Sequence, residues 1–213
     1  MIKMLFLPIL VVLCITFVTN GQTDSELAEK LYIRLLKHQR AEQLDAIKSF
    51  SKISSYEKQY SMITLMAEKV FTAIQASRAH IESSPYIPGV SDFPLDNNVR
   101  IALSNILENT VLFCEMILRF PDIATSVMKI NNNWDVLLQW SIAFSNQVKY
   151  LLDPPTVKLL TLVSMELNHI ERDVNYVNPY RKKTSKIDSV KNAKKTKKKK
   201  TIKKGPRLTH FEL

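Results

Sequence analysis

Apolar residues recur along most of the chain with the three- and four-residue spacing of helices, and no stretch sustains the alternation typical of a strand. Ser25 is suited to cap a first helix, in which Leu27, Leu31 and Leu35 follow at four-residue spacing as an apolar face. We expect this helix to continue to a break at Ser54. The chain holds only three glycines, which also favours a helical fold.

A second helix is predicted from residue 56 to residue 81, where a three-four repeat lasts for more than three heptads. Its repeat positions are Tyr56, Tyr60, Ile63, Ala67, Val70, Ile74, Ser77 and Ile81. The first two helical segments are expected to form a long antiparallel hairpin. Residues 83–98 contain three prolines and one glycine, so they are predicted to form a loop.

Further helical segments follow this loop. The third helix carries apolar residues on most of its faces, so we expect it to lie at the centre of the protein. Pro121 suits the first turn of a fourth helix, residues 131–133 end that helix and cap the next, and Asp153 begins the last one. The predicted fold is all-α: a compact multi-helix bundle with a long N-terminal helical hairpin, with Trp134 and Trp140 packed in its core.

Residues 1–21 have the three-part layout of a secretory signal peptide. Lys3 supplies a positive start, an apolar run of about 14 residues follows, and Thr19 and Gly21 are small residues at the cleavage positions. The run is shorter than the roughly 20 residues that span a bilayer, and we expect no later stretch to be long and apolar enough to do so. A buried N-terminal helix is the alternative interpretation.

Charge divides the chain into two parts. The whole sequence carries a formal charge of +10, but residues 181–213 hold 14 basic residues against two acidic ones, a net of +12, which leaves −2 for residues 1–180. A block of like charge with few apolar residues cannot bury enough surface to fold. We therefore predict a helical domain at residues 22–180 and a disordered, lysine-rich tail at residues 181–213.

The sequence shows no pattern typical of catalysis or of metal binding. The four histidines lack partners at a metal-ligand spacing, phosphate-binding and hydrolase motifs are absent, and carboxylates are scattered as on solvated helix faces. Cys114 lies in an apolar helical stretch, so a buried hydrophobe is favoured over a thiol that pairs with a partner. We predict a non-enzymatic protein without cofactor or metal.

The lysines of the tail form a candidate segment for binding partners or polyanions. Clustered cations on a flexible chain bind anionic partners with salt-sensitive affinity. The lysine segment, residues 194–204, contains Lys194, Lys195, Lys197, Lys198, Lys199, Lys200, Lys203 and Lys204. Because the signal peptide removes the chain from nucleic acid, acidic chaperones, heparan sulfate or surfaces near the ribosome are the expected partners. The alternative is a solubilising spacer that presents the end of the chain.

The last four residues, His210, Phe211, Glu212 and Leu213, resemble a signal for retrieval to the endoplasmic reticulum. The basic residue at the fourth-last position and the final Glu-Leu fit such a signal, whereas Phe211 replaces the usual acidic residue. Together with the signal peptide, this ending predicts a protein of the endoplasmic reticulum lumen that is bound by a retrieval receptor and is partly secreted.

Three stretches, LENTVLFCEMILRFPDI, NNNWDVLLQWSIAFSNQ and the closing KKGPRL, resemble the coiled-coil domain-containing protein 134 family. The resemblance extends over residues 25–213 and indicates an invertebrate member. It is most specific at Glu108, Asn109, Thr110, Arg119, Phe120, Pro121, Asn133, Trp134, Trp140, Gly205, Pro206 and Arg207. The chain departs from vertebrate members at residues 146–148, where they carry a glycosylation sequon, and in its last residues.

The resemblance implies a small, non-enzymatic protein of the secretory pathway. It implies association with the luminal chaperone endoplasmin, protection of that chaperone from excess N-glycosylation, and thereby support for the folding of cell-surface receptors. Two alternatives are a secreted negative regulator of mitogen-activated protein kinase signalling and a nuclear partner of acetyltransferase adaptors. In the leading hypothesis the helical body binds the chaperone while the basic tail contacts an acidic surface.

Overall fold

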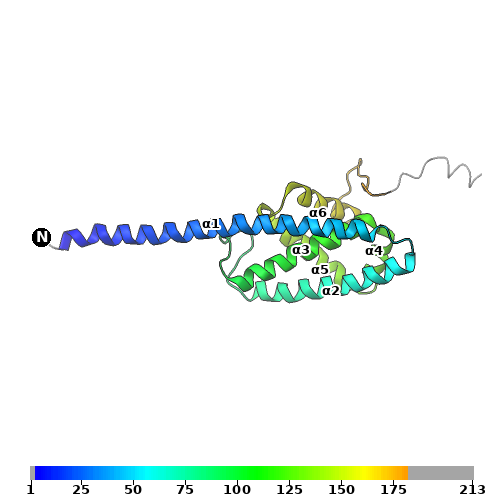
Figure 1. Cartoon of the computed structure of the whole chain (residues 1–213), viewed down its shortest axis with the longest axis horizontal. Helices are drawn as coiled ribbons and strands as arrows, with labels where there is room; N and C mark the ends of the chain where they lie inside the picture. Colours follow the sequence, from blue (N-terminus) through cyan, green and yellow to red (C-terminus); the bar gives the residue numbers. More distant parts are fainter. Residues whose placement is uncertain (1–2, 182–213) are drawn as a thin grey trace, which may run out of the picture. The chain divides into compact units, whose positions relative to one another are not determined.

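The computed structural model describes residues 3–181 of the 213-residue chain, with side chains from residue 24 onward, and the regular elements of this part are all helices joined by loops (Figure 1). The helices are α1 (Lys3–Phe50), α2 (Tyr56–Glu82), α3 (Asn97–Arg119), α4 (Pro121–Met128), α5 (Asn132–Gln147) and α6 (Pro154–Glu166), with a short 3-10 helix η1 (Lys149–Leu151) before α6. The predicted all-α bundle is confirmed. The predicted tail, apart from its first residue, lies outside the described residues.

Local hydrogen bonds explain where the later helices begin. Ser55, Asp96, Asn131 and Asp153 precede α2, α3, α5 and α6, and each accepts a backbone N–H two or three residues ahead through its side-chain oxygen. The shortest of these bonds is 2.7 Å, at Asp96. Pro121 occupies the first position of α4, where its missing N–H costs nothing. The predicted starts of α4, α5 and α6 are therefore confirmed.

The central helix of the bundle is α3. Figure 1 shows it between α1 and α2, and α4, α5 and α6 also pack against it. Of its 23 residues, 13 are buried, which confirms the predicted central position. By length and composition α3 could cross a membrane, so the expectation that no stretch after residue 21 is long and apolar enough to do so is wrong. Because 67% of its most apolar window is buried within the protein, α3 has the character of a core helix.

The predicted repeat of α2 forms a buried face from Ile63 onward, while Tyr56 at its start is exposed. Ile63, Ala67, Val70 and Ile74 are all shielded from solvent by the neighbouring helices, and Phe71 joins them. The most extensive packing of α2 is against α3, and α4 and α5 also pack against it. The apolar stripe of α2 is thus matched by neighbours over most of its length.

The first helix differs from the prediction at its start. It begins at Lys3 and passes residue 25 without a break, so Ser25 is not a cap. The Ser25 hydroxyl instead donates a hydrogen bond of 3.0 Å to the carbonyl of Phe93, in the loop before α3. The assignment of residues 1–21 to a signal peptide stays a prediction.

The apolar face predicted for α1 is also oriented differently from expectation. Leu27, Leu31 and Leu35 are between 54% and 73% exposed, whereas Tyr32 and Ile47, on a neighbouring face, are buried. The chain path from α1 to α2 reverses direction as a hairpin does, but α3 lies between the two helices (Figure 1). Each therefore packs mainly against α3 rather than against the other.

Candidate partner-binding site

Many of the residues predicted to bind partners lie outside the described part of the chain. These are the retrieval-like residues His210, Phe211, Glu212 and Leu213, the lysine segment, and the motif residues Gly205, Pro206 and Arg207. Their proposed roles stay predictions. The other motif residues, from Glu108 to Trp140, can be placed, and they do not converge on one site.

Most of the motif residues on α3 and α4 stabilise the helices. The Asn109 amide and the Thr110 hydroxyl each donate to a carbonyl one turn earlier, at 2.8 and 2.6 Å. Phe120 meets Phe50 of α1 edge to face, with ring centroids 5.1 Å apart. Pro121 follows as the start of α4. These residues explain the geometry of the α3–α4 corner rather than a chemical function.

The motif residues of α5 pack in two different environments. Trp134 stacks on Phe71 with centroids 5.3 Å apart, so its predicted core position is confirmed. Trp140 is only partly buried, and the guanidinium of Arg78 lies 4.6 Å from its ring centroid. Asn133 donates its backbone N–H to the capping side chain at the start of the helix. Trp140 is therefore at the edge of the core and not within it.

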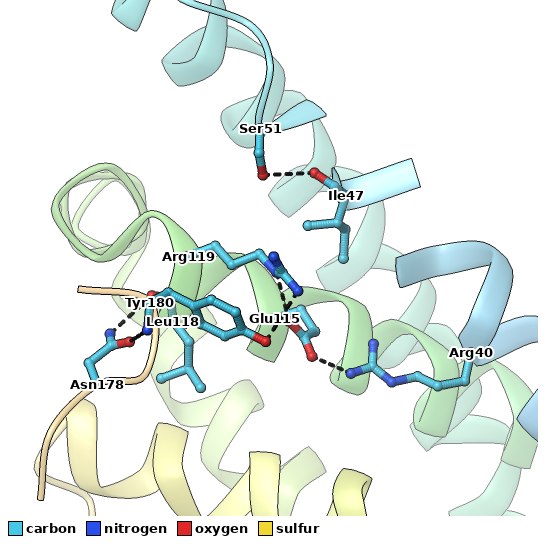
Figure 2. A network of polar contacts seen from close by, with 8 residues as sticks. All are labelled: Arg40, Ile47, Ser51, Glu115, Leu118, Arg119, Asn178 and Tyr180. Atoms are coloured by element: carbon cyan, nitrogen blue, oxygen red, sulfur yellow. Dashed lines mark hydrogen bonds and ion pairs between the residues drawn. The ribbon is translucent and has the colours of Figure 1, made fainter. Parts of the chain in front are cut away.

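Arg119 belongs to a buried ion cluster that was not predicted (Figure 2). The carboxylate of Glu115 accepts hydrogen bonds from two guanidinium groups, that of Arg40 on α1 and that of Arg119 on α3, the latter at 2.9 Å. The side chain of Glu115 is 5% exposed, and those of Arg40 and Arg119 are 14% and 17% exposed. Because two cations share one anion, the cluster keeps an excess positive charge.

One hydrogen-bond donor of this cluster is unsatisfied. Nη1 of Arg40 is buried and has no hydrogen-bond partner among the described residues. Such a group carries a desolvation cost that most buried polar atoms avoid. A local signal for half of the cluster exists, since Glu115 stands in an apolar run with Arg119 four residues later. The contribution of Arg40 has no such signal.

The segment that follows α6 contacts the same cluster and the end of α3 (Figure 2). The amide of Asn178 donates to the carbonyl of Leu118 at 3.0 Å, and its side-chain oxygen accepts the N–H of Tyr180 at 2.9 Å. The Arg119 guanidinium lies 4.1 Å from the centroid of the Tyr180 ring and donates to its hydroxyl at 3.1 Å. The last described residues are thereby held against the end of α3.

A small cavity lies between α1, α3 and the η1–α6 connection, with a volume of about 90 Å³. Apolar side chains form most of its wall, namely Ile33, Leu36, Leu107, Val111, Leu151 and Leu152. Its polar lining consists of Lys37, Arg40, Gln43, Glu108, Asp153 and Thr156. The cavity thus shares Arg40 with the ion cluster and includes Glu108, one of the motif residues.

Burial changes the chemistry of Glu108, which lines this cavity, and of Cys114 in the core. It raises the pKa of the Glu108 carboxyl, which favours the protonated form compared with an exposed glutamate. It also raises the pKa of the Cys114 thiol far above its ordinary value, so this fully buried residue stays neutral and unreactive. The predicted buried position of Cys114 is confirmed. Within the described residues, no group of three or more His, Cys, Asp or Glu side chains is arranged to hold a metal ion.

Comparison with known proteins identifies relatives over most of the chain. A family model described as "ERK and JNK pathways, inhibitor" matches residues 18–209. The chain is 30% identical to the coiled-coil domain-containing protein 134 of Mus musculus over 152 residues, which cover 71% of this chain and 66% of the mouse protein. It is also 30% identical to the Xenopus tropicalis protein of that name over 166 residues, covering 78% and 72% of the two chains. No solved structure matches the chain.

Proposed function

The chain belongs to the coiled-coil domain-containing protein 134 family of ERK and JNK pathway inhibitors, and we propose that it is a non-enzymatic, protein-binding regulator of the secretory pathway. The observation that carries this proposal is the family match, which extends through the helical body and most of the basic tail. Only the first 17 residues precede that match, and they contain most of the apolar run of the predicted signal peptide. This arrangement supports a signal peptide that is removed from the mature protein.

In the leading form of the proposal, the protein is an adaptor in the lumen of the endoplasmic reticulum. It associates with endoplasmin, limits the excess N-glycosylation of that chaperone, and supports the folding of cell-surface receptors. The resemblance of residues 210–213 to a retrieval signal supports this location. The lysine segment would add long-range attraction to an acidic surface of the chaperone.

A second candidate function is a secreted inhibitor that lowers ERK and JNK signalling from outside the cell. The description of the family names these pathways and so supports the inhibition of ERK and JNK signalling. Phe211 favours secretion, because an apolar residue replaces the usual acidic one in the retrieval-like ending. A nuclear role is the least supported alternative, since the N-terminal leader directs the chain away from the nucleus.

Expression of the full chain in cultured cells separates these possibilities. The measurements are the amounts of protein in lysate and medium, the proteins captured from microsomes, and the phosphorylation of ERK and JNK after growth-factor treatment. The luminal adaptor predicts mainly intracellular protein, capture of endoplasmin, and lowered phosphorylation only in expressing cells. Lowered phosphorylation in cells that do not express the protein, but receive the medium of expressing cells, would instead establish the secreted inhibitor. Unchanged phosphorylation in both cases would refute pathway inhibition.

Two variants of the tail test whether residues 210–213 and the lysine segment have separate roles. Deletion of residues 210–213 is expected to raise secretion without changing the helical signal or the thermal midpoint, because an address read by a receptor has no role in folding. Replacement of the lysines of the lysine segment by Gln is expected to weaken partner capture, most clearly at low salt, because at physiological salt the attraction between charges more than about 8 Å apart is largely screened. Secretion that is unaffected by the deletion would contradict the retrieval signal.

A further inference from the structure

The cavity beside the ion cluster has the size of one side chain. An apolar cavity of about 150 Å³ holds a single benzene molecule, and the present cavity has a volume of about 90 Å³. Its space suits one branched aliphatic group of leucine size and excludes a lipid chain or a large cofactor. Its apolar walls come from α1, α3 and η1, three elements that meet only in the folded protein.

The charge on the α1 side of the cavity is positive. Arg40 lines the cavity and shares the single carboxylate of Glu115 with Arg119, so one positive charge of the cluster is not neutralised. Nη1 of Arg40 also lacks an acceptor. Lys37, one turn earlier on α1, lines the same cavity, is exposed, and forms no ion pair or hydrogen bond with the described residues.

Two acidic residues, Asp153 and Glu108, also line the cavity, but they come from the residue before α6 and from α3 rather than from α1. Asp153 uses its Oδ1 atom to cap α6, where it accepts the N–H of Thr156 at 3.2 Å. Burial raises the pKa of Glu108, which favours its neutral form compared with an exposed glutamate. The α1 side therefore offers cations to an incoming group, while the floor of the cavity offers apolar contact.

From this combination we propose that the cavity is a docking site for a partner polypeptide that inserts a leucine-sized side chain and places a neighbouring carboxylate on Lys37 and Arg40. The apolar group fills space that the protein leaves open, and the carboxylate meets the excess positive charge beside it. The inference rests on the proposed function only in that it takes the partner to be a protein. It specifies the chemistry of one contact and is independent of the compartment.

The test uses the protein as purified from expressing cells, with labelled methyl groups observed by NMR during titration with three capped dipeptides. The acetylated, amidated Leu-Glu dipeptide should shift the methyl signals of Leu107, Val111 and Leu151 saturably, with a Kd on the order of millimolar for so small a probe. The Leu-Gln dipeptide should bind about threefold to tenfold more weakly because it lacks the carboxylate. The Ala-Glu dipeptide should give no saturable shift because it leaves the cavity unfilled.

A matched pair of charge reversals separates the site from general electrostatics. Lys37→Glu should weaken the Leu-Glu dipeptide at least about threefold and leave the Leu-Gln dipeptide within about twofold. Lys30→Glu, on an exposed part of α1 away from the cavity, makes the same change in net charge and should alter neither affinity. Both side chains are exposed, so both variants are expected to keep the wild-type thermal midpoint.

Three results would overturn the proposal. Equal binding of the Leu-Glu and Leu-Gln dipeptides would show that the carboxylate does not contribute to binding. The absence of saturable shifts with every dipeptide would show that the cavity is not a docking site. Tighter binding of free 4-methylpentanoate than of the Leu-Glu dipeptide would assign the cavity to a small acid rather than to a polypeptide. None of these results depends on the phosphorylation of ERK and JNK, so failure of the docking proposal and failure of pathway inhibition are distinguishable.

Discussion

The two longest helices, α1 and α2, both carry apolar residues at helical spacing, in steps of four in α1 and of three and four in α2, yet only α2 buries most of them. Ile74 of α2 is fully buried, whereas Leu31 of α1 is more than half exposed. The reason is the set of neighbours: α2 lies along α3 and is also covered by α4 and α5, while α1 meets only α3 and η1 extensively. Periodicity shows that a helix has an apolar face, but the available partners decide whether that face is buried.

Separate contacts, rather than a continuous stripe, hold α1 on the bundle. Tyr32 accepts a hydrogen bond of 3.0 Å from a serine of α3, Arg40 binds Glu115, and the Gln43 amide donates to a backbone carbonyl of α3 at 3.3 Å. Near its end, Ile47 and Phe50 join the main core cluster. The stability contributed by α1 should therefore depend on a few specific side chains, and that of α2 on its whole buried face.

The largest effect is expected from breaking the charged contact of α1. Glu115→Gln leaves two buried guanidinium groups without a carboxylate, and we expect a loss of about 3–5 kcal/mol in the free energy of unfolding. The control is Glu82→Gln, which removes an exposed ion pair with Arg78 and should cost at most about 1 kcal/mol. Urea denaturation measures both values. Similar losses in the two variants would show that the ion cluster does not anchor α1.

The next largest effect compares the two stripes directly. Ile74→Ala empties part of the core around α2 and is expected to cost about 2–5 kcal/mol in the free energy of unfolding. Leu31→Ala removes an exposed side chain from α1 and should change that free energy by no more than about 0.5 kcal/mol. The same denaturation experiment applies. A loss above 2 kcal/mol for Leu31→Ala would mean that the leucine face of α1 is covered in solution.

A smaller effect is expected at Tyr32, where α1 bonds to Ser104. Tyr32→Phe keeps the buried ring and deletes the hydroxyl, so it should cost about 0.5–1.5 kcal/mol in the free energy of unfolding. Tyr56→Phe is the matched control, because Tyr56 is an exposed tyrosine at the start of α2 and the same change should be neutral there. If both variants matched the wild type, the hydroxyl contact would contribute nothing to holding α1.

The smallest effect is a pH dependence of the difference in the free energy of unfolding between wild type and Tyr32→Phe. Burial raises the pKa of Tyr32 above its ordinary value near 10, so above pH 10 the hydroxyl ionises in the unfolded chain before it does so in the folded protein. The stabilisation from the neutral hydroxyl is complete below pH 10 and is lost as pH rises further. The gap between wild type and Tyr32→Phe should shrink by about 0.8 kcal/mol at pH 10.5. A gap that widens on going from pH 8 to 10.5 would refute this assignment.

The starts of α4, α5 and α6 were predictable because their causes are local. Asn131 and Asp153 act on N–H groups two or three residues ahead, and Pro121 acts through its own backbone. The apolar face of α2 was also predictable from its repeat, whose positions from Ile63 onward are buried against neighbouring helices. The ion cluster and the cavity were not, because each combines residues of α1 and α3, and Arg40 is 75 residues from Glu115. No spacing rule connects such positions.

By itself, the sequence determined the all-α class, the extent of α2, the starts of α4, α5 and α6 and the central position of α3, because capping and apolar periodicity act over a few residues. The relation to the family could also be read from its motifs. Only the tertiary structure decided that Leu27, Leu31 and Leu35 face solvent and that Glu115 is shared by two arginines. Those outcomes depend on which helices come together, since burial is a property of the neighbours and not of the residue.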